Sequence, residues 1–228
     1  MLCTLENVRA NIRNRDGKRV YFLREGDRLT SEARDFLNRE RIEIRPASQA
    51  PISRYRLLCG AETAEKPEHM THLHADVLVL KTHPRIAFRG AMDTLEAELL
   101  LCTLYAPALR GELEEILALA RKIVRWEVME EPAQSGRLLG LTPEELRRQS
   151  QDPQRFCGQP HFMPAPSDGP ALLWVNRCRC AARSAELAAA RAFVDTDGQV
   201  SRGDLLQVLN RMSSALYLLM IRLKKENG

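Results

Sequence analysis

Four polar residues share one side of a helix predicted for the segment 176–186. Asn176, Arg179, Arg183 and Glu186 recur at intervals of three, four and three residues, the spacing of an apolar heptad seam. The rest of this helix is rich in Ala, Leu and Cys. Two arginines on such a stripe are typical of a site that receives an anion or a carboxylate. A solvated helix face is the simpler alternative.

A basic segment precedes another predicted helix. Lys81 and Arg85 flank a turn containing Pro84, which leads directly into the predicted helix 87–105. Free N–H groups at a helix N-terminus, together with two cations, can hold a phosphate. Asp93 follows Arg85 by eight residues, on roughly the same side of the helix. A basic loop in front of a surface helix is the alternative interpretation.

Polar residues also interrupt a strongly apolar helix predicted near the C-terminus. Asn210, Ser213 and Ser214 lie among leucines and methionines in the segment 209–220. A buried Asn in a helix must satisfy its amide. This pattern predicts a contact with a ligand or, more commonly, a hydrogen bond to another helix.

Composition limits the possible functions. The chain has 228 residues, enough for one medium domain and a small appendage. Its 34 basic and 30 acidic residues give a net charge of +4, and aromatic residues make up 5%. Because basic and acidic residues are nearly equal in number and aromatic rings are few, the composition argues against nucleic-acid binding. No stretch approaches the roughly 18–20 apolar residues that span a bilayer, which predicts a soluble protein.

The six cysteines contain no Cys-x-x-Cys pair. Cys178 and Cys180 fall on nearly opposite sides of the predicted helix and cannot chelate together. We find no signal peptide, so the expectation is reduced thiols in a cytoplasmic protein.

The chain is predicted to have three parts. Residues 1–47 are expected to form a small α/β region, with strands near 20–23 and 42–45, a turn at 24–27, and a helix from Thr30 or Ser31 to about 39. Residues 48–70 contain Pro51 and Pro67 and are expected to be a linker or irregular loop.

Residues 71–228 are expected to form a helical bundle. The helical pattern begins near residue 75, and the capping sequence from Thr142 to Glu145 opens a short helix. Longer helices are predicted over 87–105, 109–129, from Asp168 onward, and from Ser201 to about 225. The fold class is therefore mainly α.

In this order, these segments resemble the corrinoid (cob(I)alamin) adenosyltransferases, most closely the ethanolamine-utilization type. The resemblance covers nearly the whole chain and rests on residues 25–34, 71–93, the polar stripe of 176–186, and 209–214. It implies a cobalamin-adenosyltransferase-like helical bundle with a small N-terminal α/β appendage. The implied reaction transfers the 5′-deoxyadenosyl group of ATP to Co(I) of cobalamin and releases triphosphate, and the nucleophile belongs to the corrinoid.

The resemblance also assigns roles to individual residues. The catalytic group comprises Arg179, Arg183 and Glu186, the last orienting an arginine or the nucleoside. The ATP-binding residues are Thr71, Lys81, Arg85 and Asn210. The residues on the cobalamin side are Asp93, expected to pair with Arg179, and Phe162, expected to lie below the corrin ring and favour four-coordinate cobalt. An aromatic anchor of the loop to the core is the alternative for Phe162.

The chain departs from the family pattern in three places. Metal-dependent members of the ethanolamine type carry His-x₁₁-Cys-Cys-x-x-Cys, whereas this chain has only Cys59 in that region. No structural transition metal is therefore expected, because three histidines in an irregular loop (His69, His72 and His74) are more often polar surface. The Gly-rich ATP loop of the propanediol type is absent, and His83 stands where the family usually has an acid.

An apparent calcium loop is a weaker match. Asp195, Asp197 and Asp204 fit positions three, five and twelve of an EF-hand. Position one would be Phe193, which cannot bind calcium, and position twelve is Asp instead of Glu. A turn between two helices explains the segment better.

The resemblance further implies Mg²⁺ with ATP, and a homo-oligomer, dimer or trimer, with sites between subunits. A reductase or a corrinoid-dependent lyase is the expected protein partner, and association with a microcompartment fits the ethanolamine type. Two other functions stay open: binding and delivery of adenosylcobalamin without turnover, and a non-enzymatic helical scaffold.

Overall fold

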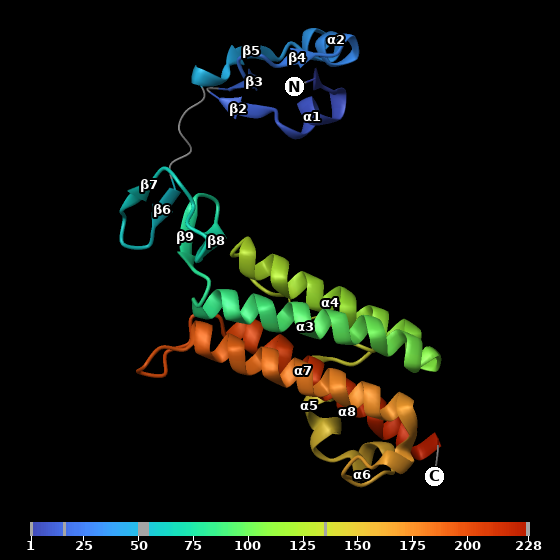
Figure 1. Ribbon diagram of the computed structural model, residues 1–228. Helices are drawn as coiled ribbons and strands as arrows, with labels where there is room; N and C mark the ends of the chain where they lie inside the picture. The colour runs from blue at the N-terminus through green and yellow to red at the C-terminus, as the bar shows by residue number, and fades with distance from the viewer. Residues whose placement is uncertain (1, 16, 50–54, 135, 227–228) are drawn as a thin grey trace. The chain divides into compact units, whose positions relative to one another are not determined.

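The computed structural model describes residues 2–15, 17–49, 55–134 and 136–226, and the chain forms two compact units, residues 1–54 and 55–228. The elements of the first unit (Figure 1) are β1 (Leu2–Cys3), α1 (Leu5–Ala10), β2 (Arg13–Arg15), β3 (Lys18–Leu23), β4 (Arg28–Leu29), α2 (Ser31–Arg39), β5 (Glu43–Pro46) and a 3₁₀ turn (Ala47–Gln49).

The first unit is built around a β-α-β arrangement. Strands β3 and β5 are parallel, α2 connects them, and β2 pairs antiparallel with β3. The Thr30 hydroxyl accepts from the Ala33 N–H at 3.2 Å and caps α2. The strand, turn, helix and strand predicted for this region are confirmed. Its small core comprises Cys3, Val8, Tyr21, Ala33, Phe36, Leu37 and Ile42.

The second unit begins with a small sheet that the sequence pattern did not predict. Its strands are β6 (Tyr55–Leu57), β7 (Glu62–Thr63), β8 (Met70–His74) and β9 (Val77–Leu80), in the order β7-β6-β9-β8. Residues 55–70 are thus not an irregular linker, and the helical pattern does not begin near residue 75. A short apolar run such as 77–80 fits a buried strand or a helix by periodicity alone, and pairing with β6 and β8 selects the strand.

The rest of the second unit is the predicted helical bundle. Its helices are α3 (Pro84–Tyr105), α4 (Arg110–Val128), α5 (Pro143–Gln151), α6 (Pro153–Cys157), α7 (Gly169–Phe193) and α8 (Gly203–Glu226). Helix α7 packs against both α3 and α8, and the short α5 packs on α8 (Figure 1). Thr142 and Glu145 form the predicted capping box of α5. The mainly α fold is therefore confirmed.

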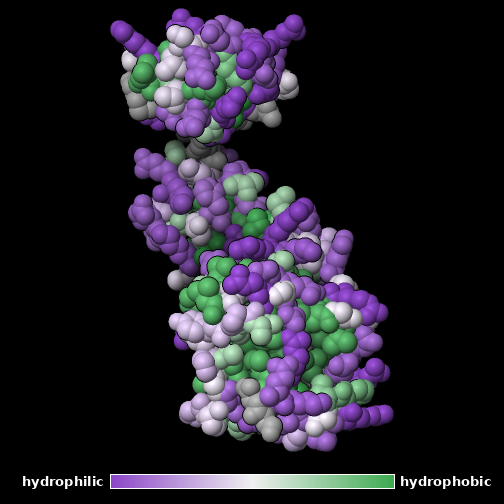
Figure 2. Space-filling model, turned by 90° about the vertical axis from the view of Figure 1, so that its right-hand side faces the viewer, coloured by the Kyte–Doolittle hydropathy of each residue, from purple (hydrophilic) through white to green (hydrophobic). Residues whose placement is uncertain are grey.

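The core of the bundle is apolar along α3, α4, α7 and α8. Fully buried members include Phe88, Leu95, Ile116, Leu172 and Leu216. Among the described residues, no helix is both long and apolar enough to cross a bilayer. Seen from the end at which α3 finishes, the bundle shows hydrophobic surface between hydrophilic side chains (Figure 2). The exposed apolar residues at that end of α3 are Leu100, Leu101, Leu104 and Tyr105.

Candidate functional site

The first turn of α3 carries an ion cluster centred on Glu127 of α4. Arg85 Nε donates to Glu127 Oε1 at 2.5 Å, and Arg85 Nη2 donates to the Glu127 carbonyl at 3.0 Å. Arg85 Nη1 donates to Glu130 Oε1 at 3.1 Å. Glu127 is fully buried. A guanidinium has five N–H donors, and among the described residues three of those of Arg85 are bound here.

Arg89 completes the cluster and ties it to the sheet. Its Nε donates to Glu127 Oε2 at 2.6 Å, and its Nη2 donates to the Leu73 carbonyl of β8 at 2.7 Å. Both oxygens of the buried carboxylate are therefore matched by a cation, which a buried charge requires. The cluster joins α3, α4 and the β8–β9 hairpin.

The connection from the hairpin into α3 is capped by histidine. His83 Nδ1 accepts from the Arg85 backbone N–H at 3.2 Å. Burial, followed by the nearby Arg85 and Arg89, lowers the pKa of His83, so the ring is neutral near pH 7 and can accept. The neutral His83 ring thus caps the helix by accepting a backbone N–H, as the carboxylate of an acidic residue at this position could. Thr71 is half-buried on β8, and Lys81 is exposed directly after β9.

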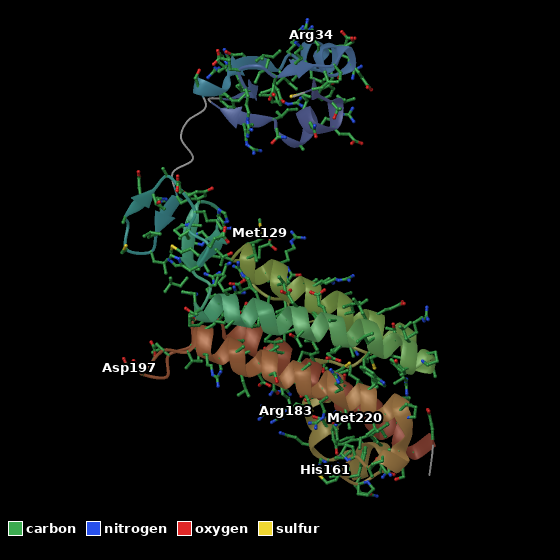
Figure 3. The ribbon with its side chains drawn as sticks, viewed as in Figure 1. Arg34, Met129, His161, Arg183, Asp197 and Met220 are labelled. Carbon is green, nitrogen blue, oxygen red and sulfur yellow. The ribbon has the colours of Figure 1, made fainter. Side chains whose placement is uncertain are left out.

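The polar stripe of α7 lies at the edge of the buried face. Arg179 is half-buried, and its Nε and Nη2 donate to Asn176 Oδ1 at 3.2 and 3.1 Å. Arg183 is exposed and has no ion-pair or hydrogen-bond partner among the described residues. Figure 3 shows its side chain projecting from α7 on the side where α5 and α6 are drawn. Arg183 therefore lies on a solvated helix face in this structure, whereas Arg179 does not.

Glu186 and Asn210 connect α7 to α8. Asn210 Nδ2 donates to Glu186 Oε1 at 2.8 Å, and Asn210 Oδ1 accepts from Arg211. The interhelical hydrogen bond expected for Asn210 is therefore present. It holds the Glu186 carboxylate one helical turn from Arg183, and Arg211 adds a positive charge beside it.

Phe162 packs on α8 through Tyr217. The two ring centroids are 6.4 Å apart with an interplanar angle of 21°. The Arg179 guanidinium lies 5.9 Å from the centroid of the same Tyr217 ring. The core-anchor interpretation of Phe162 thus describes a contact that exists, and this contact leads to the polar stripe.

The predicted site residues fall into two groups. One group, Arg85 with the neighbouring Thr71 and Lys81, lies at the start of α3. The other comprises Arg179, Arg183, Glu186, Asn210 and Phe162. The Arg85 guanidinium is 6.0 Å from the ring of Phe193, which ends α7, and Arg183 precedes Phe193 by ten residues, about 15 Å along the helix axis. The two arginines therefore lie in separate clusters along the bundle.

Asp93 does not form its expected ion pair within the chain. It is exposed on α3, and it has no ion-pair partner among the described residues. Arg179 uses Asn176 as its acceptor instead. Asp93 could pair with Arg179 only if the Asp93 carboxylate came from another subunit, or if the Arg179 side chain adopted another conformation.

Glu127, Arg89, Tyr217 and His161 contribute to these clusters but were not among the predicted site residues. Two of them carry a signal in the sequence. Glu127 continues the apolar spacing of α4 four residues after Ile123, so an acid stands in a buried stripe. Tyr217 follows Asn210 by seven residues and shares its helix face. Arg89 and His161 are recognised only by their contacts.

The described residues show no group of three or more His, Cys, Asp or Glu side chains arranged to hold a metal. His72 and His74 lie on strand β8 and not in an irregular loop. In the apparent calcium loop, Asp195 Oδ1 accepts from the N–H groups of Asp197 and Gln199. Asp204 is bound to Arg202 and to the Ala133 N–H, which supports the interpretation of this segment as a turn.

Known proteins resemble this chain over more than two thirds of its length. A family model described as cobalamin adenosyltransferase matches residues 61–223. Corrinoid adenosyltransferase EutT of Salmonella typhimurium and that of Escherichia coli are each 34% identical over 165 residues, which is 72% of this chain. The chain spans 62% of the length of these relatives. Since the family model covers more than half of the chain and contains both arginine groups, this chain belongs to the cobalamin adenosyltransferase family.

Proposed function

We propose that this chain is an ATP:corrinoid adenosyltransferase of the ethanolamine-utilization type. The observation that carries the proposal is the family match over residues 61–223, which includes every predicted site residue. Similarity to two EutT corrinoid adenosyltransferases supports the ethanolamine type. In the reaction, the C5′–O bond of ATP breaks, a Co–C5′ bond forms, and triphosphate leaves with the electron pair of the broken bond.

The protein's share of this chemistry is to hold ATP and neutralise the leaving triphosphate. Arg183 suits this role because its guanidinium is exposed and unpaired among the described residues. Arg179 lies one turn earlier on the same stripe, with its guanidinium already oriented by Asn176. Glu186, held by Asn210, would orient an arginine or the nucleoside.

The start of α3 would supply the remaining phosphate contacts. Lys81 is exposed there, and Arg85 keeps two N–H donors beyond those bound by Glu127 and Glu130. Glu127 fixes the direction of the Arg85 side chain, which limits the reorganisation needed when a phosphate binds. Thr71 would contact ATP from β8, and Mg²⁺ would accompany the nucleotide.

Phe162 and Asp93 are assigned to the corrinoid side. An apolar ring below the corrin disfavours a lower axial ligand and makes reduction of Co(II) easier. Phe162 is only partly buried, which is compatible with contact to a corrinoid.

A site completed between subunits agrees with the separation of the two groups. Arg85 and Arg183 lie in different clusters of one chain, and Asp93 has no ion-pair partner among the described residues. A homo-oligomer, dimer or trimer, would bring one group of one subunit against the other group of its neighbour. A reductase or corrinoid-dependent lyase as protein partner, and a cytoplasmic or microcompartment location, belong to the same proposal.

The test is anaerobic. The protein is mixed with ATP, Mg²⁺ and chemically reduced cobalamin, and the visible spectrum is followed for loss of Co(I) and growth of a light-sensitive alkyl-cobalt product. Product should form, and Arg183→Ala should lower the rate about a hundredfold, since one preorganised cation contributes about 3 kcal/mol. The matched control is Arg191→Ala, an exposed arginine on the same helix. No product from folded protein, with corrinoid binding detected, would instead select a delivery protein; absence of both binding and product would select a scaffold.

A further inference from the structure

Tyr217 of α8 contacts both groups that are assigned to the two substrates. Its ring stacks on Phe162 with centroids 6.4 Å apart, and the Arg179 guanidinium lies 5.9 Å from its centroid. Phe162 comes from the loop 158–168, and Arg179 from α7. Among the described residues, Tyr217 is the one whose ring contacts both Phe162 and Arg179.

The hydroxyl of Tyr217 adds a third contact. His161 Nδ1 lies 2.8 Å from the Tyr217 hydroxyl, and His161 Nε2 lies 3.2 Å from the Gln151 carbonyl. Because a carbonyl only accepts, Nε2 carries a hydrogen, and in the tautomer with the hydrogen on Nε2 alone, Nδ1 accepts from the phenol. Burial raises the pKa of Tyr217, so the phenol keeps the proton it donates.

A separate ion pair fastens the other end of the same loop. Lys224 Nζ donates to the buried Asp168 carboxylate at 2.5 Å, and Asp168 Oδ2 accepts from the Ala165 N–H at 2.8 Å. Lys224 also lies 5.6 Å from the centroid of the Phe162 ring. Asp168 thus secures the end of the loop, while Tyr217 secures the part that bears Phe162. Figure 3 places His161 within this loop, below α8.

We propose that Tyr217 is a positioning residue that sets Phe162 and Arg179 together, so that the corrinoid-facing ring and a phosphate-binding cation are held on one aromatic platform. This inference rests on the proposed function for the roles of Phe162 and Arg179. The physical basis is that a ring has two useful properties here. Its face attracts a guanidinium, and its stacked geometry orients a second ring. The hydroxyl bonds to His161, and the ring alone forms the platform.

The experiment separates the ring from the hydroxyl and measures binding without turnover. Tyr217→Leu removes the platform, Tyr217→Met removes it with less loss of volume, and Tyr217→Phe removes only the hydroxyl. The affinity for Mg²⁺–ATP is measured by titration calorimetry. The fraction of four-coordinate Co(II) in bound cob(II)alamin with ATP is measured by electron paramagnetic resonance. Thermal unfolding confirms that each variant is folded.

Tyr217→Leu and Tyr217→Met should weaken ATP binding about three- to tenfold and lower the four-coordinate fraction by a similar factor, the range expected for one cation–π and one aromatic contact. Tyr217→Phe should stay within about twofold of wild type in both measurements, because the ring remains. Wild-type values in a folded Tyr217→Met protein for either measurement overturn the proposal.

Two reference variants distinguish this inference from its premise. Arg179→Ala should weaken ATP binding, and Phe162→Ala should lower the four-coordinate fraction. If both do so while Tyr217→Met is normal, only the platform is rejected. If either reference variant is normal, the assigned role of that residue in the proposed function is wrong, and the platform is rejected with it.

Discussion

Arg85 and Arg183 both stand in basic helical segments, yet their surroundings differ. Arg85 is bound by the fully buried Glu127 and by Glu130, whereas Arg183 is exposed without a partner among the described residues. The first arginine is therefore part of the packing between α3 and α4. The second is available to a ligand. Burial of the counter-charge, and not the residue type, makes the surroundings of the two arginines different.

The largest expected effect tests the buried half of this comparison. Glu127→Ala leaves Arg85 and Arg89 without their shared carboxylate, which should lower the free energy of unfolding by about 3–5 kcal/mol. Urea unfolding followed by helical circular dichroism measures it. Glu130→Ala is the control, because that side chain is 59% exposed and should cost less than about 1 kcal/mol. Equal losses in the two variants would show that burial of Glu127 does not set the strength of the cluster.

A smaller effect concerns Asp204, which ties the start of α8 to the segment after α4. Hydrogen bonds from Arg202 and then from the Ala133 N–H lower the pKa of Asp204 to about 2. Because this pKa lies below the unfolded value, near 4, the carboxylate contributes stability above about pH 4, and the contribution is lost as the pH falls toward 2.

Asp204→Asn should therefore lower the free energy of unfolding by about 1–2 kcal/mol at pH 7 and by much less near pH 2. Unfolding curves of wild type and variant across this range give the difference. The Asp204 side chain is 31% exposed. The size of the loss therefore shows whether the partly exposed Arg202–Asp204 pair stabilises the fold less than the buried Glu127 cluster. A difference that stays constant with pH would contradict the ionic origin.

The smallest expected effect is on the open half of the comparison. Arg183→Ala should change the free energy of unfolding by less than about 0.5 kcal/mol, as is usual for an exposed side chain without partners. Denaturant unfolding of this variant beside Arg191→Ala provides the measurement. A loss well above that of Arg191→Ala would show that Arg183 forms a structural contact, for example between subunits, which a repeat at lower protein concentration would reveal.

Much of the fold was predictable because its signals are local. The starts of α2 and α5 follow from the caps Thr30 and Thr142, α7 starts at the predicted Asp168-Gly-Pro170 sequence, and the apolar spacing of α4 identified its buried face. The strands β6–β9 were missed because each is too short for a clear periodic pattern, and because β9 also pairs in parallel with β6, which lies about twenty residues earlier in the sequence. His72 and His74 lie on β8, which pairs with the following strand β9.

The candidate site also has features that the sequence predicted and features that it did not. Helical spacing alone aligned Asn176, Arg179, Arg183 and Glu186 on one face of α7, because 3.6 residues per turn set that face regardless of the rest of the chain. Spacing could not reveal which of these arginines is paired. In the structure Arg179 donates to Asn176 on the same helix and also lies over the ring of Tyr217, which α8 brings to it, whereas Glu186 is held by Asn210 of α8.

Residue types and their order along the chain were thus sufficient for the helices, the polar stripe and the family resemblance, because each depends on near neighbours. Packing was needed to show that Arg85 is held by a buried carboxylate, that Phe162 rests on Tyr217, and that Arg183 has no partner among the described residues. The contacts of Arg85 and Phe162 join residues far apart in sequence, and their strength depends on how much water they exclude.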